Sequence, residues 1–144
     1  MSEPTRRVAV VSGASRHGSI GREVAEHLVR TGYRVVASDI GQALTTHPDY
    51  EVAPPDDLTD LATSYDSDDL VTHPCDVTDE AQVEALFAHA EQTYGTVDVA
   101  VNCAGLGIGL KPVVDLELRD WQVNIDVMAT GADRKSTRLN SSHS

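Results

Sequence analysis

The segment that most constrains the fold is Val8–Gly21, with the sequence VAVVSGASRHGSIG. Its first four residues are small and apolar without alternation, which predicts a parallel strand buried on both faces. A run rich in Gly and Ser follows, and an amphipathic helix begins near Ile20. A strand, a glycine-rich turn and a helix offer backbone N–H groups and a helix N-terminus to a phosphate. We therefore expect this turn to hold the diphosphate of a nicotinamide dinucleotide.

Alternating strands and helices follow this turn. The patterns predict helices near residues 20–30, 79–94 and 113–130, and strands at residues 7–12, 34–39, 70–74 and 97–101. We expect Ile20 and Ala81 on buried helix faces, Thr78 as the N-cap of the second helix and Gly95 at its end. The predicted fold class is α/β, a three-layer, doubly wound Rossmann-type fold with a parallel sheet, truncated after about four strands.

Residues 41–69 form an acidic insertion in this pattern. The segment contains three prolines and many acidic residues, and a short helix capped by Asp56 or Asp57 is expected near residues 57–64. We expect most of it to be a solvated loop, and the alternative is a lid or a specificity insertion. Residues 1–132 are then one partial nucleotide-binding domain.

Composition excludes several classes of function. The formal net charge is −12, and no Lys or Arg lies between Val35 and Leu110, so nucleic acid and anionic lipid are not expected partners. No apolar run approaches the ~20 residues that span a bilayer, and the N-terminus lacks the apolar core of a signal peptide. The histidines show no metal-ligand spacing. With only two cysteines, the expected location is the cytoplasm.

The last residues differ in character from the rest. Residues 133–144 are polar and lack periodicity, so we expect a disordered tail. Residues 133–143 match the translation of a common short-read sequencing adapter, which indicates that the authentic sequence ends at about Ala132.

Asp39 ends the second predicted strand, eighteen residues after Gly21. A carboxylate there can accept hydrogen bonds from both hydroxyls of an adenosine ribose, and it repels a 2′-phosphate. Asp39 therefore favours NAD over NADP. Arg16, inside the turn, favours NADP, and we give Asp39 the greater weight because it lies where a 2′-phosphate would be bound.

The order of these motifs resembles the short-chain dehydrogenase/reductase family over residues 7–131. The family's first turn is shorter by two residues, and Ser19 stands here in place of its middle glycine. The lengthened turn is similar to that of bacterial enoyl-acyl-carrier-protein reductases, whereas Asn102-Cys-Ala-Gly105 resembles the ordinary branch. The resemblance implies cofactor contacts at Gly13, Ser15, Arg16, Gly18, Ser19, Ile20, Gly21, Asp39, Ile40, Asp76, Val77, Asn102, Ala104 and Gly105.

The catalytic residues of that family are not found in this sequence. Residues 121–131 resemble a helical motif of the family that carries an Asn of the proton relay, and Met128 occupies its place, with Asn124 one turn earlier. The family's catalytic Ser and Tyr-x3-Lys would follow Gly131, and none of the four tyrosines has Lys four residues later. We therefore expect the cofactor-binding half of an NAD(P)-dependent oxidoreductase acting on an alcohol or carbonyl substrate, inactive by itself.

Two alternatives remain open from the sequence. One is a non-catalytic dinucleotide-sensing Rossmann domain, and the other is an extended-type nucleotide-sugar epimerase or dehydratase. The family resemblance also implies that the intact protein is a homo-oligomer.

Overall fold

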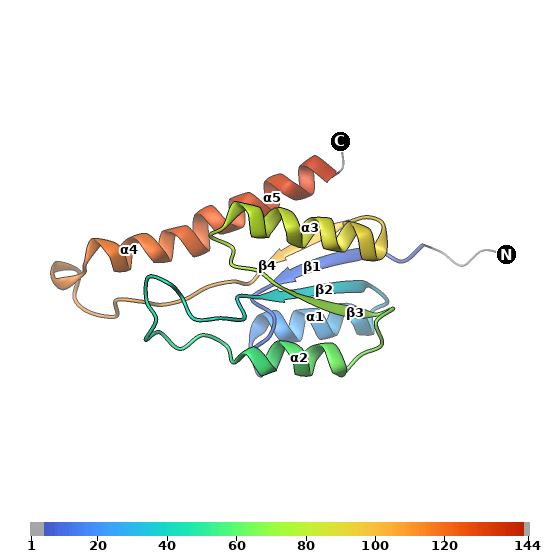
Figure 1. The fold of residues 1–144 in the computed structure, drawn as a ribbon, viewed down its shortest axis with the longest axis horizontal. Coiled ribbons are helices and arrows are strands. Elements are labelled where there is room, and N and C mark those ends of the chain that lie inside the picture. The colour runs from blue at the N-terminus through green and yellow to red at the C-terminus, as the bar shows by residue number, and fades with distance from the viewer. Residues whose placement is uncertain (1–4, 143–144) are drawn as a thin grey trace.

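A single parallel sheet forms the centre of the computed structural model, which describes residues 5–142 (Figure 1). Its strands are β1 (Val8–Ser12), β2 (Arg34–Asp39), β3 (Leu70–Pro74) and β4 (Val99–Asn102). Their order in the sheet is β3-β2-β1-β4, so the chain reverses direction across the sheet between β1 and β4. In sheets of this kind, ligands bind at the carboxyl ends of the strands beside such a reversal.

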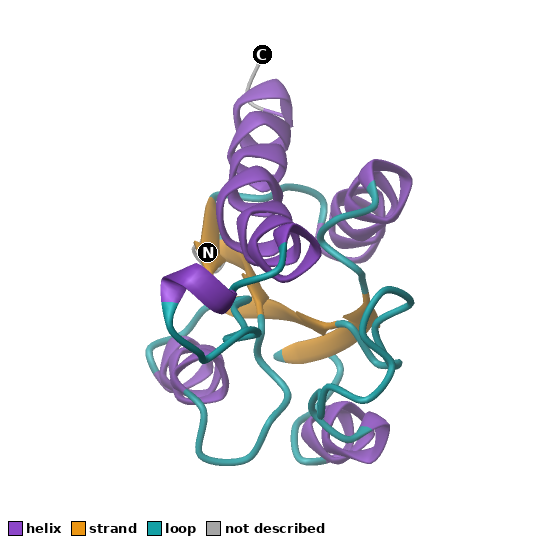
Figure 2. Ribbon diagram, turned by 90° about the vertical axis from the view of Figure 1, so that its left-hand side faces the viewer, coloured by secondary structure: helices purple, strands orange, loops and turns teal. Residues whose placement is uncertain are grey.

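Helices cover both faces of the sheet, which confirms the three-layer α/β class. α1 (Ile20–Arg30) and α2 (Pro55–Thr63) lie on one face, and α3 (Glu80–Tyr94) and α5 (Gly131–Ser142) lie on the other (Figures 1 and 2). A 3₁₀ turn η1 (Val113–Asp115) precedes α4 (Leu118–Ile125), and a π-helical turn η2 (Asp126–Thr130) joins α4 to α5.

The core is divided between the two faces because neighbouring residues of a strand point to opposite sides. Val10 and Val36 pack with Leu86 and Phe87 of α3. Val11, Val35 and Ala37 instead join a second cluster, which includes residues of α1 and α2. Burial on both faces explains why these strands are continuously apolar in sequence.

Four local predictions are wrong. Asp79, not Thr78, caps α3, because its carboxylate accepts from the N–H groups of Ala81 and Gln82. Ala81 is exposed, and Ile20 is 79% exposed because it is the first residue of α1, next to the turn. α2 begins at Pro55 without a side-chain cap, so neither acidic residue proposed for that role supplies one.

The insertion after β2 is packed more tightly than a solvated loop. Residues 42–54 are irregular, yet Leu44 and Ala53 are each only 7% exposed. Leu58 and Leu61 of α2 are also buried. The apolar residues of this acidic segment are therefore its anchors on the domain.

Residues 131–142 form helix α5 in place of the predicted disordered tail. No proline interrupts the chain after α4, and Gly131 has helical dihedral angles, so the helical path continues. α5 contacts α3 and β4, Arg134 donates to the Thr78 carbonyl at 2.9 Å, and Arg138 forms an ion pair with Glu84. Lys135 is 1% exposed, and burial lowers its pKa to about 8.

Candidate functional site

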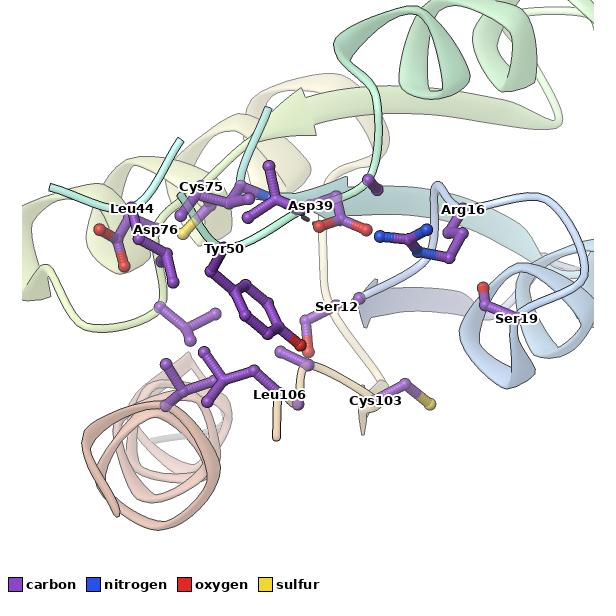
Figure 3. Close-up of a pocket in the computed structure, with 18 of the residues that line it drawn as sticks. Ser12, Arg16, Ser19, Asp39, Leu44, Tyr50, Cys75, Asp76, Cys103 and Leu106 are labelled. Atoms are coloured by element: carbon purple, nitrogen blue, oxygen red, sulfur yellow. Dashed lines mark hydrogen bonds between the residues drawn. The ribbon is translucent and has the colours of Figure 1, made fainter. Parts of the chain in front are cut away.

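A cavity of about 270 Å³ opens at the carboxyl ends of the strands (Figure 3). Segments that are distant in sequence meet there: the glycine-rich turn, the end of β2, the turn after β3 and the loop after β4. Nine of the residues predicted from sequence line it: Gly13, Arg16, Ser19, Asp39, Ile40, Asp76, Val77, Ala104 and Gly105.

The glycine-rich turn packs closely against the loop after β4. Gly13 has a φ of 68°, and a Cβ atom there would lie 2.5 Å from the carbonyl carbon of Cys103. A Cβ atom on Gly21 would lie 2.1 Å from the Gly13 carbonyl oxygen. Gly18 has a φ of 76° with open space around it. Gly13 and Gly21 are therefore required by close packing, and Gly18 by backbone conformation alone.

The carboxylate of Asp39 ties β2 to this turn. Its Oδ2 accepts from the backbone N–H of Ser15 at 3.0 Å and from the Ser15 hydroxyl at 2.8 Å. Its Oδ1 accepts from the N–H of Ile40 at 2.8 Å. Each carboxylate oxygen has two lone pairs, so Asp39 uses both sites of Oδ2 and one of Oδ1 to hold the turn, and Oδ1 can accept one further hydrogen bond.

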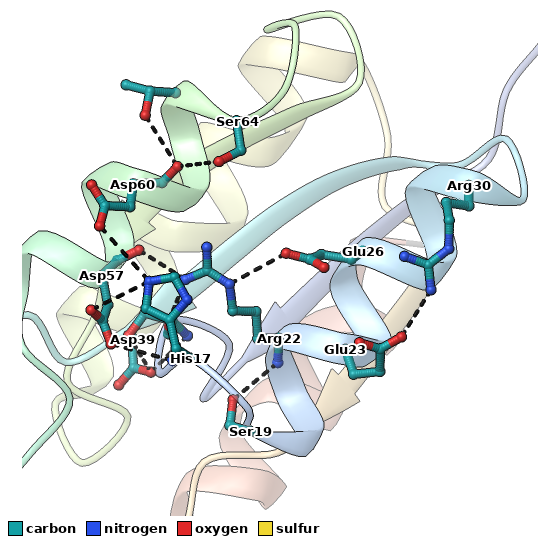
Figure 4. A network of polar contacts seen from close by, with 12 residues as sticks. His17, Ser19, Arg22, Glu23, Glu26, Arg30, Asp39, Asp57, Asp60 and Ser64 are labelled. Atoms are coloured by element: carbon teal, nitrogen blue, oxygen red, sulfur yellow. Dashed lines mark hydrogen bonds and ion pairs between the residues drawn. The ribbon is translucent and has the colours of Figure 1, made fainter.

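Arg22 contacts the glycine-rich turn and α2 (Figure 4), and it is not among the residues predicted from sequence. Its buried Nη1 donates to the carbonyl of Ser15 at 2.7 Å and to that of Asp57 at 3.2 Å, while its Nε pairs with Glu26 at 3.3 Å. The Ser19 hydroxyl caps α1 by accepting from the Arg22 N–H at 3.2 Å. The only sequence signal for Arg22 is a basic residue in the first turn of a helix, where acidic residues are favoured.

Asp76 and Val77 shape the far end of the cavity through the turn after β3. The Oδ1 atom of Asp76 accepts from the N–H and the hydroxyl of Thr78 at 2.9 and 2.7 Å. Val77 packs with Val123 and Val127 in a small apolar cluster. Asp76 therefore orders its own turn, and Val77 supplies an apolar wall.

The loop after β4 brings its backbone to the cavity. The N–H of Cys103 donates to the Ser12 carbonyl at 3.2 Å, which extends the pairing of β1 with β4. Asn102 is exposed and does not line the cavity. Burial raises the pKa of the Cys103 thiol, and it raises that of Cys75 to about 11, so both thiols are protonated near neutral pH.

The remaining predicted residues lie beside the cavity rather than on its wall. Ser15 and Gly21 are buried under the turn, whereas Gly18 and Ile20 are exposed. No residue of the insertion was predicted from sequence to be part of the site, yet five of them also line the cavity: Leu44, Tyr50, Glu51, Val52 and Ala53. No local sequence signal marks these residues, because their position depends on how the loop folds back over the strand ends.

Met128 lies near the loop after β4. Its Sδ would be 3.8 Å from a Cβ atom placed on Gly105, and the residue is 46% exposed. The Asn124 amide is engaged elsewhere, because its Nδ2 donates to the carbonyls of Ile108 and Asp120 at 2.9 and 2.6 Å. Asn124 therefore fixes the loop after β4.

His17 lies against α2, where its Nε2 is 3.7 Å from Asp57 Oδ1 and 3.8 Å from Asp60 Oδ2 (Figure 4). These three side chains could provide atoms to one cation, although the sequence predicted no metal site. His17 and Asp60 are both exposed, and exposed acidic groups often cluster without a metal ion.

Comparison with known proteins identifies the fold and the family. A family model described as enoyl-(acyl carrier protein) reductase matches residues 13–139. A short-chain dehydrogenase/reductase variant from Serratia marcescens superposes with a TM-score of 0.78 at 22% identity, over 97% of this chain and 52% of that one. The chain belongs to the short-chain dehydrogenase/reductase family.

Two further relatives are consistent with this assignment. An uncharacterized oxidoreductase of Staphylococcus haemolyticus is 32% identical over 131 residues, which are 91% of this chain and 50% of the relative. A short-chain dehydrogenase/reductase from Burkholderia phymatum, solved in complex with NAD, is 25% identical with a TM-score of 0.73, over 98% of this chain and 45% of that one. The chain thus spans about half the length of the curated relatives it matches. Among residues 5–142, none of the helices combines the length and apolar character needed to cross a bilayer.

Proposed function

We propose that the chain is the cofactor-binding half of an oxidoreductase that transfers hydride between NAD and an alcohol or carbonyl substrate. One observation carries the proposal: the Asp39 carboxylate lies on the same cavity as Gly13 and Ala104, at the carboxyl ends of three parallel strands. A dinucleotide needs a close backbone approach for its diphosphate and a carboxylate for its ribose, and this cavity has both.

Different residues around the cavity would bind different parts of the dinucleotide. The N-terminus of α1, capped by Ser19, would face the diphosphate, and Oδ1 of Asp39 would accept from a ribose hydroxyl. Asp76 and Val77 would border the adenine ring, and the backbone of Ala104 and Gly105 would approach the second ribose. The bound nicotinamide would supply or accept the hydride.

Binding selectivity tests this assignment. NADH should bind more tightly than NADPH, and Asp39→Asn should reduce the difference because the amide no longer repels a 2′-phosphate. Asp49→Asn is the matched control, since Asp49 is an exposed acidic residue that does not line the cavity. Titration of NADH and NADPH fluorescence measures both affinities, and an unchanged ratio in Asp39→Asn would contradict the proposed role of Asp39.

The chain itself should not transfer hydride, because it has no Tyr-x3-Lys pair to move the proton. Incubation with NADH and a panel of ketones should leave the absorbance at 340 nm constant. Steady oxidation that depends on the ketone would overturn this expectation.

Met128 favours a second candidate, a domain that senses dinucleotides without catalysis. A thioether cannot relay a proton, and Met128 stands where the family carries an Asn. The downstream sequence separates the two functions: a Ser and a Tyr-x3-Lys support the oxidoreductase, and their absence supports the sensor.

We also propose that the intact protein is a homo-oligomer through α4. Leu118, Trp121, Ile125 and Met128 follow one another at helical spacing and are 37–77% exposed. An apolar face of this kind marks a protein contact more often than a solvated surface. Light scattering after gel filtration should show more than one copy, and Trp121→Glu should shift the population toward the monomer.

A further inference from the structure

The loop between β2 and α2 crosses the cavity that we assign to the dinucleotide. We call residues 41–54 the covering loop. Leu44 and Ala53, near its two ends, are buried, and Tyr50 and Val52 between them line the cavity. Figure 3 shows the ring of Tyr50 projecting into the middle of the pocket, between Asp39 and Leu106.

Side-chain contacts hold the middle of the covering loop in place. His47 Nε2 lies 2.9 Å from Asp120 Oδ1, and both side chains are 9% exposed. An ionised carboxylate can only accept, so this nitrogen carries the donated hydrogen. The other ring nitrogen, Nδ1, lies 2.9 Å from the Thr46 hydroxyl. The buried contact therefore connects the covering loop to α4.

Two weaker contacts involve the backbone. The Tyr50 hydroxyl accepts from the N–H of Gly107 at 3.3 Å, and Arg16 Nη2 donates to the Glu51 carbonyl at 3.1 Å. Both are solvent-exposed, so each contributes less than the buried His47–Asp120 pair. The loop is thus attached to the glycine-rich turn, to the loop after β4 and to α4.

The free space of the cavity is small, because the Tyr50 ring occupies its middle (Figure 3). Pockets that enclose a drug-sized ligand measure roughly 300–1,000 Å³, whereas this cavity measures about 270 Å³. A dinucleotide is larger than most such ligands, and the Tyr50 ring lies within the space. A dinucleotide that extends from Asp39 to Ala104 would therefore meet the Tyr50 ring unless the covering loop moves.

We propose that the covering loop is a lid that must open before the dinucleotide enters, and that the His47–Asp120 contact holds it closed. This proposal rests on the proposed function. The closed lid reduces the fraction of molecules competent to bind, and the apparent affinity falls by that fraction. His47 and Asp120 are positioning residues, because they act through the covering loop and do not line the cavity. The Tyr50 ring is the part of the lid that excludes the ligand.

Stopped-flow fluorescence of NADH with the full chain tests this proposal. His47→Ala and Asp120→Ala should each raise the association rate by about tenfold, the factor expected for a lost hydrogen bond to a charged group. The double variant should be no faster than either single variant, because both remove the same contact. Asp49→Ala changes an exposed residue of the same loop and should bind at the unmodified rate.

Tyr50 provides a second measurement that does not depend on the His47–Asp120 contact. Tyr50→Ala should accelerate association, whereas Tyr50→Phe, which keeps the ring, should leave it slow. If NADH binds the unmodified chain and every variant at the same rate, the lid is refuted while the proposed function stands. If neither the unmodified chain nor His47→Ala binds NADH, the proposed function fails, and the lid fails with it.

Discussion

Gly13 and Gly18 provide a matched pair of substitutions that separates backbone strain from close packing. Both residues have positive φ values, 68° and 76°, so an alanine at either position adopts an unfavourable left-handed conformation. That conformation costs about 1–2 kcal/mol. Around Gly18 there is nothing within 4 Å of an added Cβ atom, so Gly18→Ala should lose only this amount.

At Gly13 a second cost is added. The new Cβ atom would lie 2.5 Å from the carbonyl carbon and oxygen of Cys103 and 2.6 Å from the N atom of Ala104. All three are backbone atoms, so no rotamer change relieves the overlap, and the turn must separate from the loop after β4. Overpacking of this kind costs a further 1–3 kcal/mol or so. Gly13→Ala should therefore lose roughly 2–5 kcal/mol in total.

Urea denaturation followed by circular dichroism measures both losses. Because the slope of unfolding free energy with urea should be unchanged, the difference appears as a lower midpoint for Gly13→Ala than for Gly18→Ala. Equal midpoints for the two variants would refute the close approach of the turn to the Cys103 carbonyl.

Three further predictions concern buried charges and titrating groups. Arg22→Met should lower the free energy of unfolding by about 2–3 kcal/mol, because two carbonyl acceptors lose a charged donor. Thermal unfolding measures this loss, and an unchanged midpoint would contradict it. Burial first, and then the stacked His89, lower the pKa of His73, so stability should fall as pH drops below its ordinary value of 6.5; His73→Gln should flatten this dependence between pH 5 and 7. Burial lowers the pKa of Lys135 from 10.5 to about 8, so above pH 8 the unfolded chain binds more protons than the folded one. The free energy of unfolding should therefore rise from pH 8 to 9. Lys135→Met should abolish this rise, and a rise that persists in the variant would refute this cause.

The regular elements follow directly from local sequence patterns. The strands at residues 34–39 and 70–74 and the helix at residues 20–30 have the predicted bounds. A strand buried on both faces requires a continuous apolar run, and an amphipathic helix requires a stripe, so both are visible in a short window. The parallel order then brings Gly13, Asp39 and Ala104 to one edge of the sheet.

The features missed by the sequence analysis depend on contacts between distant residues. Tyr50 enters the cavity because the covering loop is attached at Asp120, seventy-three residues after His47 in the chain. Arg22 supports the turn through carbonyl groups, which every residue has, so no residue type identifies its acceptors. Helix α5 was predicted to be disordered because its polar composition gives no periodicity, whereas its position follows from the uninterrupted helical path after α4.

The most direct test of a dinucleotide site is an NMR titration of the ¹⁵N-labelled chain with NAD. Glycine amides resonate in a separate region of the spectrum, and this chain has them both at the cavity and away from it. Gly13 and Gly105 line the cavity, whereas Gly32 and Gly95 follow the carboxyl ends of α1 and α3. The account predicts saturable shifts of the first two amides and none of the last two. Unchanged Gly13 and Gly105 signals at saturating NAD would contradict the site.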